Sequence, residues 1–324
     1  MHDWQHVVAR WILAGAVFLL ACAASAPLSM LVWQARRRLS AVGLKGIFSF
    51  LLLLPLGMAL FVLLSYSLPS CFHRQACYIG WLLHAFGEGA LIWTRPVAML
   101  VGGMLLVSLV GLVYRTATVV RTVRGLVALS SPPSPKLANV LRQVVPHRWH
   151  ARFRQVEMSP DADGVYGGVC LLSHETVRSL SEGQLKAVVA HEYQHLRARD
   201  GWFALCMGLL ASSLGLRAWN TMYCYWSSAA ELLADARTTQ QGVARRELAR
   251  TLLDRQVAAQ GVVLGFSSRG TLLDERMQRL LTPVPESGLA QVLWALVLVC
   301  AGGLLYTVWQ TSNASTCTIH CLLF

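Results

Sequence analysis

Charged residues are scarce in this chain of 324 residues, since Asp, Glu, Lys and Arg together make up only 14%. An ordinary soluble domain has about a quarter. Acidic residues are the scarcer kind, with 16 Asp and Glu against 28 Lys and Arg, whereas hydrophobic residues reach 55%. This composition excludes a disordered chain and argues against an ordinary soluble enzyme. It is typical of a membrane protein that carries a polar domain.

Two kinds of motif are also missing. A net charge of +12 would suit a nucleic-acid-binding protein, but no such motif accompanies the basic residues, so we expect no direct contact with nucleic acid. Five of the nine cysteines, in the predicted spans and the predicted cytoplasmic domain, show no paired metal-binding spacing. These five are interpreted as small buried apolar residues: Cys22, Cys170, Cys206, Cys224 and Cys300.

Long hydrophobic runs, in contrast, are present. A bilayer takes about 20 helical residues to cross, and four segments are long and apolar enough, at residues 11–33, 47–68, 97–114 and 288–308. The fold class we predict is a mainly α, polytopic membrane protein with four transmembrane helices and an inserted small α+β domain.

The basic residues predict the orientation of these spans. One cluster fills the connection between the first two spans, at Arg36, Arg37, Arg38 and Lys45. Most of the others follow the third span, and only three of the 28 lie on the opposite side, at Arg10, Arg74 and Arg95. By the positive-inside rule the basic side is cytoplasmic. Both termini are then expected on the outer side. If the cell is bacterial, the protein is expected in its inner, cytoplasmic membrane.

The predicted organisation has three parts. They are an N-terminal membrane region with three spans (1–114), a cytoplasmic domain (115–287), and the last span with a short outer tail (288–324). A short apolar segment at 80–93 is expected to be an interfacial helix on the outer side. Four cysteines also fall on that side, where an oxidising compartment would allow disulfides: Cys71, Cys77, Cys317 and Cys321.

Strands and a well-defined helix start are predicted in the cytoplasmic domain. Residues 153–158 and 165–173 are expected to be strands. Because Gly167 and Gly168 lack side chains, another backbone could approach closely there. Ser181, followed three residues later by Gln184, fits a capping box at the start of a helix over 182–199.

That helix carries His191-Glu192-Tyr193-Gln194-His195, an H-E-x-x-H pattern. Positions i and i+4 lie one turn apart on one helix face, so both imidazoles can bind one zinc ion. Glu192 can then reach a zinc-held water molecule and act as general base. Because a single match can arise by chance, a third ligand is the deciding test.

Glu231 is the candidate for the third ligand, in the segment Glu231-Leu232-Leu233-Ala234-Asp235. It would complete a site of two histidines and one carboxylate, with the fourth position left for water. Asp235, one turn further on, could accept a hydrogen bond from a ligand imidazole. The alternative is that both carboxylates lie on the solvated face of a surface helix.

The apolar segment between these motifs constrains the topology. If residues 201–216 crossed the membrane once, Glu231 would lie on the opposite side from the histidines. We therefore predict a helical hairpin within 201–238 that turns near Trp219-Asn220, with its aromatic residues at the membrane interface. Tyr223, Tyr225 and Arg237 lie nearby as candidates to stabilise a tetrahedral intermediate, and the sequence does not select one.

Three segments carry a family resemblance: AHEYQHLRARD (190–200), ELLAD (231–235) and ERMQRLL (275–281). They resemble the BlaR/MecR-type family of integral membrane zinc metallopeptidases and, less closely, the HtpX-type and CAAX prenyl endopeptidases. The resemblance covers roughly residues 135–285 and implies a small gluzincin-like domain. It also implies that a substrate strand lies along an edge strand near 164–172.

The same resemblance implies residue roles. His191, His195 and Glu231 would bind one zinc ion per chain, Glu192 would be the catalytic base, and Asp235 would support a ligand. The best-known members carry an extracellular penicillin-binding domain after the last span. Only sixteen residues follow Val308 here, so we expect no penicillin-sensing domain.

We therefore predict a zinc metalloendopeptidase that hydrolyses peptide or protein substrates at the cytoplasmic face of the lipid bilayer. A transcriptional repressor is one substrate that the resemblance implies, and membrane-protein quality control is another role. The alternatives are a non-proteolytic signal transducer with a structural zinc site, and an assembly factor in which the motif is accidental. The sequence gives no indication of the oligomeric state.

Overall fold

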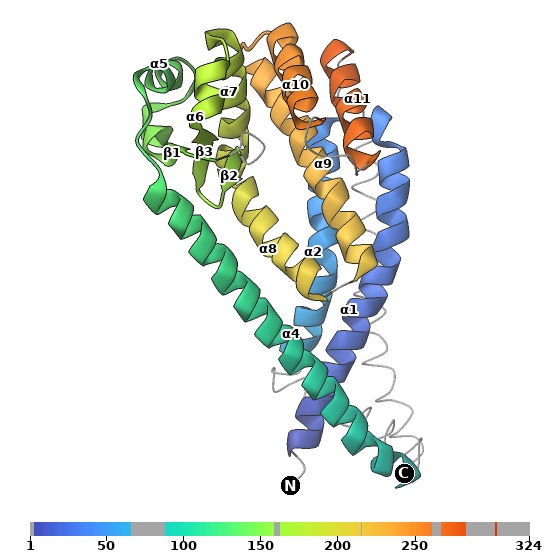
Figure 1. Cartoon of the computed structure of the whole chain (residues 1–324). Helices are drawn as coiled ribbons and strands as arrows, with labels where there is room; N and C mark the ends of the chain where they lie inside the picture. Colours follow the sequence, from blue (N-terminus) through green and yellow to red (C-terminus); the bar gives the residue numbers. More distant parts are fainter. Residues whose placement is uncertain are drawn as a thin grey trace.

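The computed structural model describes residues 3–65, 88–158, 163–214, 216–260 and 267–282, together with residue 302. This described part is mainly α-helical with one three-stranded sheet, which confirms the predicted fold class at that level. Long helices form a bundle, and a smaller domain that contains the sheet lies at one end of it (Figure 1). All of the fourth predicted span except residue 302, and most of the segment 80–93, lie outside the described residues. So do five cysteines: Cys71, Cys77, Cys300, Cys317 and Cys321.

Within the described residues, two helices are long and apolar enough to cross a membrane. They are α1 (Asp3–Gln34) and α2 (Ala41–Ser65), joined through the short 3-10 helix η1 (Arg36–Arg38). The qualifying windows are Val17–Gln34 and Ala41–Leu60. The two helices pack side by side (Figure 1). Large apolar side chains are exposed on their outer surface, as a lipid-facing helix requires: Leu19, Leu31, Leu53 and Leu60.

The third predicted span falls within α4 (Glu88–Leu129), a helix of 42 residues. The structure thus agrees that residues 97–114 are helical, while their crossing of a membrane stays a prediction. Val107, Val110 and Val113 are each more than half exposed. α4 runs from the far end of the bundle to the domain with the sheet (Figure 1).

The sheet contains three strands: β1 (Phe153–Val156), β2 (Gly164–Tyr166) and β3 (Val169–Ser173). Their order is β1-β3-β2, with β1 parallel and β2 antiparallel to β3. The prediction of one strand over 165–173 is wrong, because the chain reverses at Gly167 and Gly168. Gly167 has φ +63°, a conformation that glycine adopts readily and that suits a two-residue hairpin turn. β2 is thus one of the two edge strands of the described sheet.

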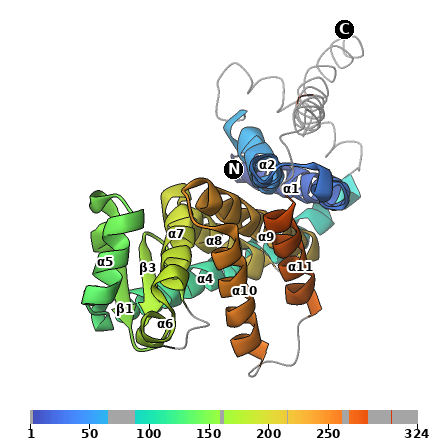
Figure 2. The ribbon, with the colours of Figure 1, turned by 90° about the horizontal axis from the view of Figure 1, so that it is seen from above.

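A hydrophobic core lies between the sheet and the helices α5 (Pro135–Val144) and α7 (Glu182–Ala198). Within α7, Leu185, Val189 and Leu196 recur on one face and are buried in this core. His191 lies about 200° round the helix from Val189, and His195 follows one turn later. Both histidines therefore point away from the sheet. Figure 2 shows that α7 lies between β3 and α9 (Arg217–Gln240), the helix that the histidines face.

α8 (Asp200–Leu214) and α9 form the helical hairpin that follows α7. The chain reverses between Leu214 and Arg217, earlier than the predicted turn near Trp219-Asn220. Trp219 and Trp226 are at most 2% exposed and pack in a cluster with α2, where Trp226 Nε1 donates to Ser49 Oγ at 3.1 Å. These two aromatic rings therefore lie buried between helices, while their position relative to a membrane interface stays a prediction.

The remaining described elements are η2 (His147–Arg152), α6 (His174–Ser179), α10 (Arg245–Gln260) and α11 (Ser267–Leu281). α10 packs on α7 and α11 on α9, so the two helices cover the side of α7 opposite the sheet (Figure 2). Among the cysteines, Cys22 and Cys170 are buried as predicted. The prediction is wrong for Cys206 and Cys224, which are exposed on the α8–α9 hairpin.

Candidate metal centre

Helix α7 carries both histidines and begins at the predicted capping box. The Ser181 hydroxyl accepts a hydrogen bond from the backbone N–H of Gln184, and the Gln184 side chain accepts one from the backbone N–H of Ser181. This prediction is confirmed. The helix continues without a break to Ala198, so His191 and His195 lie one turn apart on one face. Their ring centroids are 4.9 Å apart.

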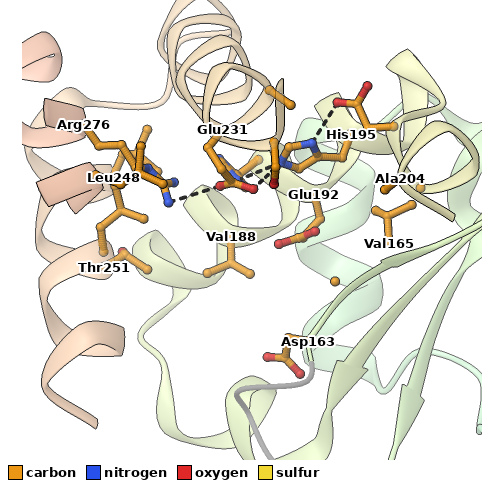
Figure 3. Close-up of a pocket in the computed structure, with 18 of the residues that line it drawn as sticks. Asp163, Val165, Val188, Glu192, His195, Ala204, Glu231, Leu248, Thr251 and Arg276 are labelled. Atoms are coloured by element: carbon orange, nitrogen blue, oxygen red, sulfur yellow. Dashed lines mark hydrogen bonds and ion pairs between the residues drawn. The ribbon is translucent and has the colours of Figure 1, made fainter. Parts of the chain in front are cut away.

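Helix α9 brings Glu231 up to the two rings (Figure 3). Its Oε2 atom lies 3.3 Å from Nε2 of His191, and its Oε1 atom lies 3.4 Å from Nε2 of His195. One ligand atom from each of the three residues lies within 4.8 Å of the other two. The structure therefore brings together the three residues that the sequence proposed as metal ligands.

The other nitrogen of each ring lies against an aspartate. Nδ1 of His195 is 2.9 Å from Oδ2 of Asp200. Nδ1 of His191 is 3.0 Å from Oδ1 of Asp235, although the angle departs from that of a regular hydrogen bond. A carboxylate at Nδ1 favours the tautomer with its proton there, which leaves the lone pair on Nε2.

These tautomers fit a bound cation. The two Nε2 atoms are 3.2 Å apart, so two lone pairs and the Glu231 carboxylate face one small space. Such donors repel one another unless a positive charge lies between them. Two imidazole nitrogens and one carboxylate are also a donor set of catalytic zinc, which keeps an open fourth position. The residues present therefore fit a zinc ion.

Arg276 of α11 neutralises the two carboxylates on the α9 side. Its Nε and Nη2 atoms donate to Oδ2 and Oδ1 of Asp235 at 2.7 and 2.8 Å. Its Nη1 atom lies 3.1 Å from Oε2 of Glu231. This fork geometry holds a carboxylate in one orientation. Asp235 is thus where the sequence placed it, and Arg276 fixes it there.

Sequence reasoning gave no role to Asp200 or Arg276, although both lie in the segments that carry the resemblance. For Asp200, the feature that explains its position is the end of α7, directly before it in the chain. Arg199 at the C-cap has φ 59° and ψ 28°, a left-handed conformation that few residues other than glycine adopt. This conformation turns the chain directly from α7 into α8, and Asp200 then lies against His195.

Gly201 allows this turn to pack against the sheet. A Cβ atom at this position would lie 2.8 Å from the carbonyl oxygens of Val165 and Gly167, closer than real Cβ atoms come. The close approach expected at Gly167 therefore occurs, and the backbone of α8 makes it. As a result the first turn of α8 is fixed against β2.

The charges at the site favour a bound cation. Burial would raise the pKa of the Glu231 carboxyl, but Arg276 and His195 hold it well below its usual range. The pKa of Asp235 is lowered against burial in the same way, chiefly by Arg276. Burial would lower the pKa of His195, but Glu231 and Asp200 raise it to about 10. Two ionised carboxylates beside the imidazoles therefore attract a positive charge.

A cavity of about 460 Å³ opens beside the three candidate ligands. Gly164 and Val165 of β2 line one side of it, and apolar residues of α10 and α11 line another, including Leu248 and Leu272. Tyr223, Tyr225 and Arg237 do not line this cavity. The structure therefore does not bring those three candidates to the site.

Glu192 lines the same cavity and is 7% exposed. Its carboxylate points into the open space near Val188 (Figure 3). No hydrogen bond to this carboxylate occurs within the described residues. A buried carboxylate that faces a cavity beside a candidate metal centre is placed to act on a molecule bound there.

Comparisons of this chain with protein-family models, with characterised proteins and with solved structures gave no match. The assignment of a function therefore rests on the geometry of the site and on the motifs in the sequence.

Proposed function

We propose that this protein is a membrane-embedded zinc metalloendopeptidase. The observation that carries the proposal is the convergence of His191, His195 and Glu231, with the Glu192 carboxylate on the wall of the adjoining cavity. The resemblance to BlaR/MecR-type metallopeptidases supports the same function. A structural zinc site, in contrast, has four protein ligands and needs neither an open position nor a cavity.

A zinc ion bound there would supply an acidified water molecule and polarise the scissile carbonyl. Glu192 is next to His191 in the helix, so its carboxylate can accept the proton of that water and pass it to the leaving amine. Asp200 and Asp235 hold the two rings with their Nε2 lone pairs toward the centre. Arg276 keeps Asp235 and Glu231 ionised.

The edge strand β2 supports an extended peptide as substrate. One side of β2 pairs with β3, and Gly164 and Val165 also line the cavity. An extended peptide can pair with an exposed strand edge through main-chain hydrogen bonds, which are independent of sequence. Leu248 and Leu272 on the other side of the cavity suit an apolar side chain near the scissile bond.

The membrane helices and the basic residues support a location. α1 and α2 would anchor the protein in the bilayer, and the positive-inside rule places the metal centre at the cytoplasmic face. A substrate that approaches from the cytoplasm or from the adjacent membrane surface would then reach β2.

The test compares purified full-length protein with variants in detergent. We expect about one zinc ion per chain in the wild-type protein and in Glu192→Gln, and a large loss in His191→Ala. Wild-type protein should cleave an unfolded protein substrate, and Glu192→Gln should lose at least about 100-fold in rate, because a general base contributes about that much. Glu182→Gln, an exposed change in the first turn of the same helix, should cleave normally.

The alternatives predict different results. If Glu192→Gln keeps zinc, fold and the full cellular output of the protein, the zinc site is structural and the protein is a non-proteolytic transducer. If wild-type protein and His191→Ala contain equally little zinc, the motif is accidental. If neither alternative holds, a proteomic comparison identifies the substrates, because they accumulate in cells with Glu192→Gln relative to cells with wild-type protein.

A further inference from the structure

Lys45 of α2 reaches the metal centre through Asp200. The sequence assigned it to the basic connection between two spans, but it lies in the second turn of α2 with its side chain only 14% exposed. Its ammonium group pairs with Oδ1 of Asp200. The other oxygen of the same carboxylate lies 2.9 Å from Nδ1 of His195. A membrane helix is thus connected to a candidate ligand by a single side chain.

The second histidine has an arrangement of the same kind. His191 faces Asp235, and Asp235 is held by Arg276. Each ligand histidine therefore has a carboxylate behind it, and each carboxylate has its own cation from a different helix. When the ring is neutral, as metal binding requires, the buried carboxylate keeps its negative charge and needs that cation.

The helix that provides Arg276 is itself tied to the junction between α1 and α2. Glu275 of α11 pairs with Arg36 of η1. Arg279 donates from Nη2 to the carbonyl oxygen of Arg36 at 2.6 Å and from Nη1 to that of Leu39 at 3.1 Å. The residues on both sides of the metal centre are therefore held by the same membrane hairpin.

We propose that Lys45 is a positioning residue of the metal centre. From α2 it holds Asp200 in the orientation that fixes the His195 ring, so the seating of the α1–α2 hairpin sets the affinity of the site for zinc. This inference rests on the proposed metal site. It adds that part of the site belongs to a membrane helix distant from the motifs in sequence.

The test measures the affinity of the full-length protein for zinc by competition with a chelator, and the absorption spectrum of the cobalt-substituted protein. Groups that orient a ligand are worth about 10–100-fold in metal affinity. We expect Asp200→Asn to lose affinity in this range and Lys45→Met to lose about tenfold, with an altered cobalt spectrum. Lys45→Arg should retain most of the affinity because it keeps the charge. Lys186→Met, which removes a surface ion pair with Glu182, should have no effect.

A double variant separates positioning from a general loss of stability. If Lys45 acts through Asp200, Lys45→Met should cause no further loss of zinc affinity in an Asp200→Asn background. Should Lys45→Met fail to fold, as judged by tryptophan fluorescence without metal, Lys45→Gln carries the same expectations. Wild-type affinity in folded Lys45→Met or Lys45→Gln would overturn the inference and leave the zinc site intact. Absence of zinc binding in the wild-type protein would instead overturn the proposed function.

Discussion

The Nε2 atoms of His191 and His195 lie 3.2 Å apart, and the Nδ1 atom of each ring lies within 3.0 Å of an aspartate oxygen. The aspartates direct both lone pairs toward the same point, where Glu231 adds a carboxylate. This geometry explains why the site should bind a metal ion. It also explains why loss of that ion should lower the stability of the folded protein.

Zinc should stabilise the folded protein. A ligand that binds only the folded state at about a hundred times its Kd adds about 2.7 kcal/mol to the free energy of unfolding. We expect zinc to raise the Tm of the metal-free wild-type protein in detergent, and not that of His195→Ala. Calcium, which prefers oxygen ligands, is the matched control and should have no effect. An equal rise of Tm in His195→Ala would mean that zinc binds elsewhere.

Arg276→Met should destabilise the protein. The change leaves the buried Asp235 carboxylate without its cation, and breaking such a pair costs about 3–5 kcal/mol. Thermal unfolding monitored by tryptophan fluorescence measures the loss. Arg250→Met, an exposed arginine on α10, should leave the Tm unchanged. If the two variants unfold at the same temperature, Arg276 is not part of the support of the site.

Gly201→Ala should lower both stability and cleavage. The new Cβ would meet the backbone carbonyl oxygens of Val165 and Gly167 at 2.8 Å, so α8 or β2 must move, at about 1–3 kcal/mol. Gly125→Ala in α4 has open space around it and should be stabilising by about 0.5–1 kcal/mol. Thermal unfolding and cleavage of an unfolded substrate compare the two. A Gly201→Ala protein as stable as wild type would show that the contact relaxes freely.

Arg199 and Arg197 should respond in opposite directions to the same substitution. Both are exposed, but Arg199 has a left-handed backbone and Arg197 lies in the last turn of α7. Arg199→Gly should stabilise the protein by about 1 kcal/mol, because it removes the left-handed penalty of a side chain. Arg197→Gly should destabilise it by about as much. Equal effects of the two changes on the Tm would contradict the left-handed turn at Arg199.

Local patterns in the sequence were enough to predict the three candidate ligands that the structure brings together. His191 and His195 are fixed by helical spacing, and Ser181 with Gln184 marks the helix start, because these depend on residues within a turn of each other. Glu231 required only the argument that α8 and α9 must turn back. The strand 165–173 was predicted wrongly because its apolar residues continue on both sides of the glycine pair.

The residues that support the ligands were not predictable in the same way. Asp200 becomes a partner of His195 only because Arg199 takes a left-handed conformation, which no local pattern requires. Lys45 was interpreted as a marker of orientation, since its charge alone does not show that it pairs with Asp200 at the start of α8. Arg276 likewise reaches Asp235 through tertiary packing of α11.

The hairpin formed by α8 and α9 has a consequence for the biogenesis of the protein. The two histidines are synthesised before the hairpin, and Glu231 reaches them only when α9 has packed against α2 and α7. A chain whose hairpin has not yet packed beside α2 therefore has only two of the three candidate ligands in place. The order of synthesis thus delays completion of the candidate metal centre until α9 has packed against α2 and α7.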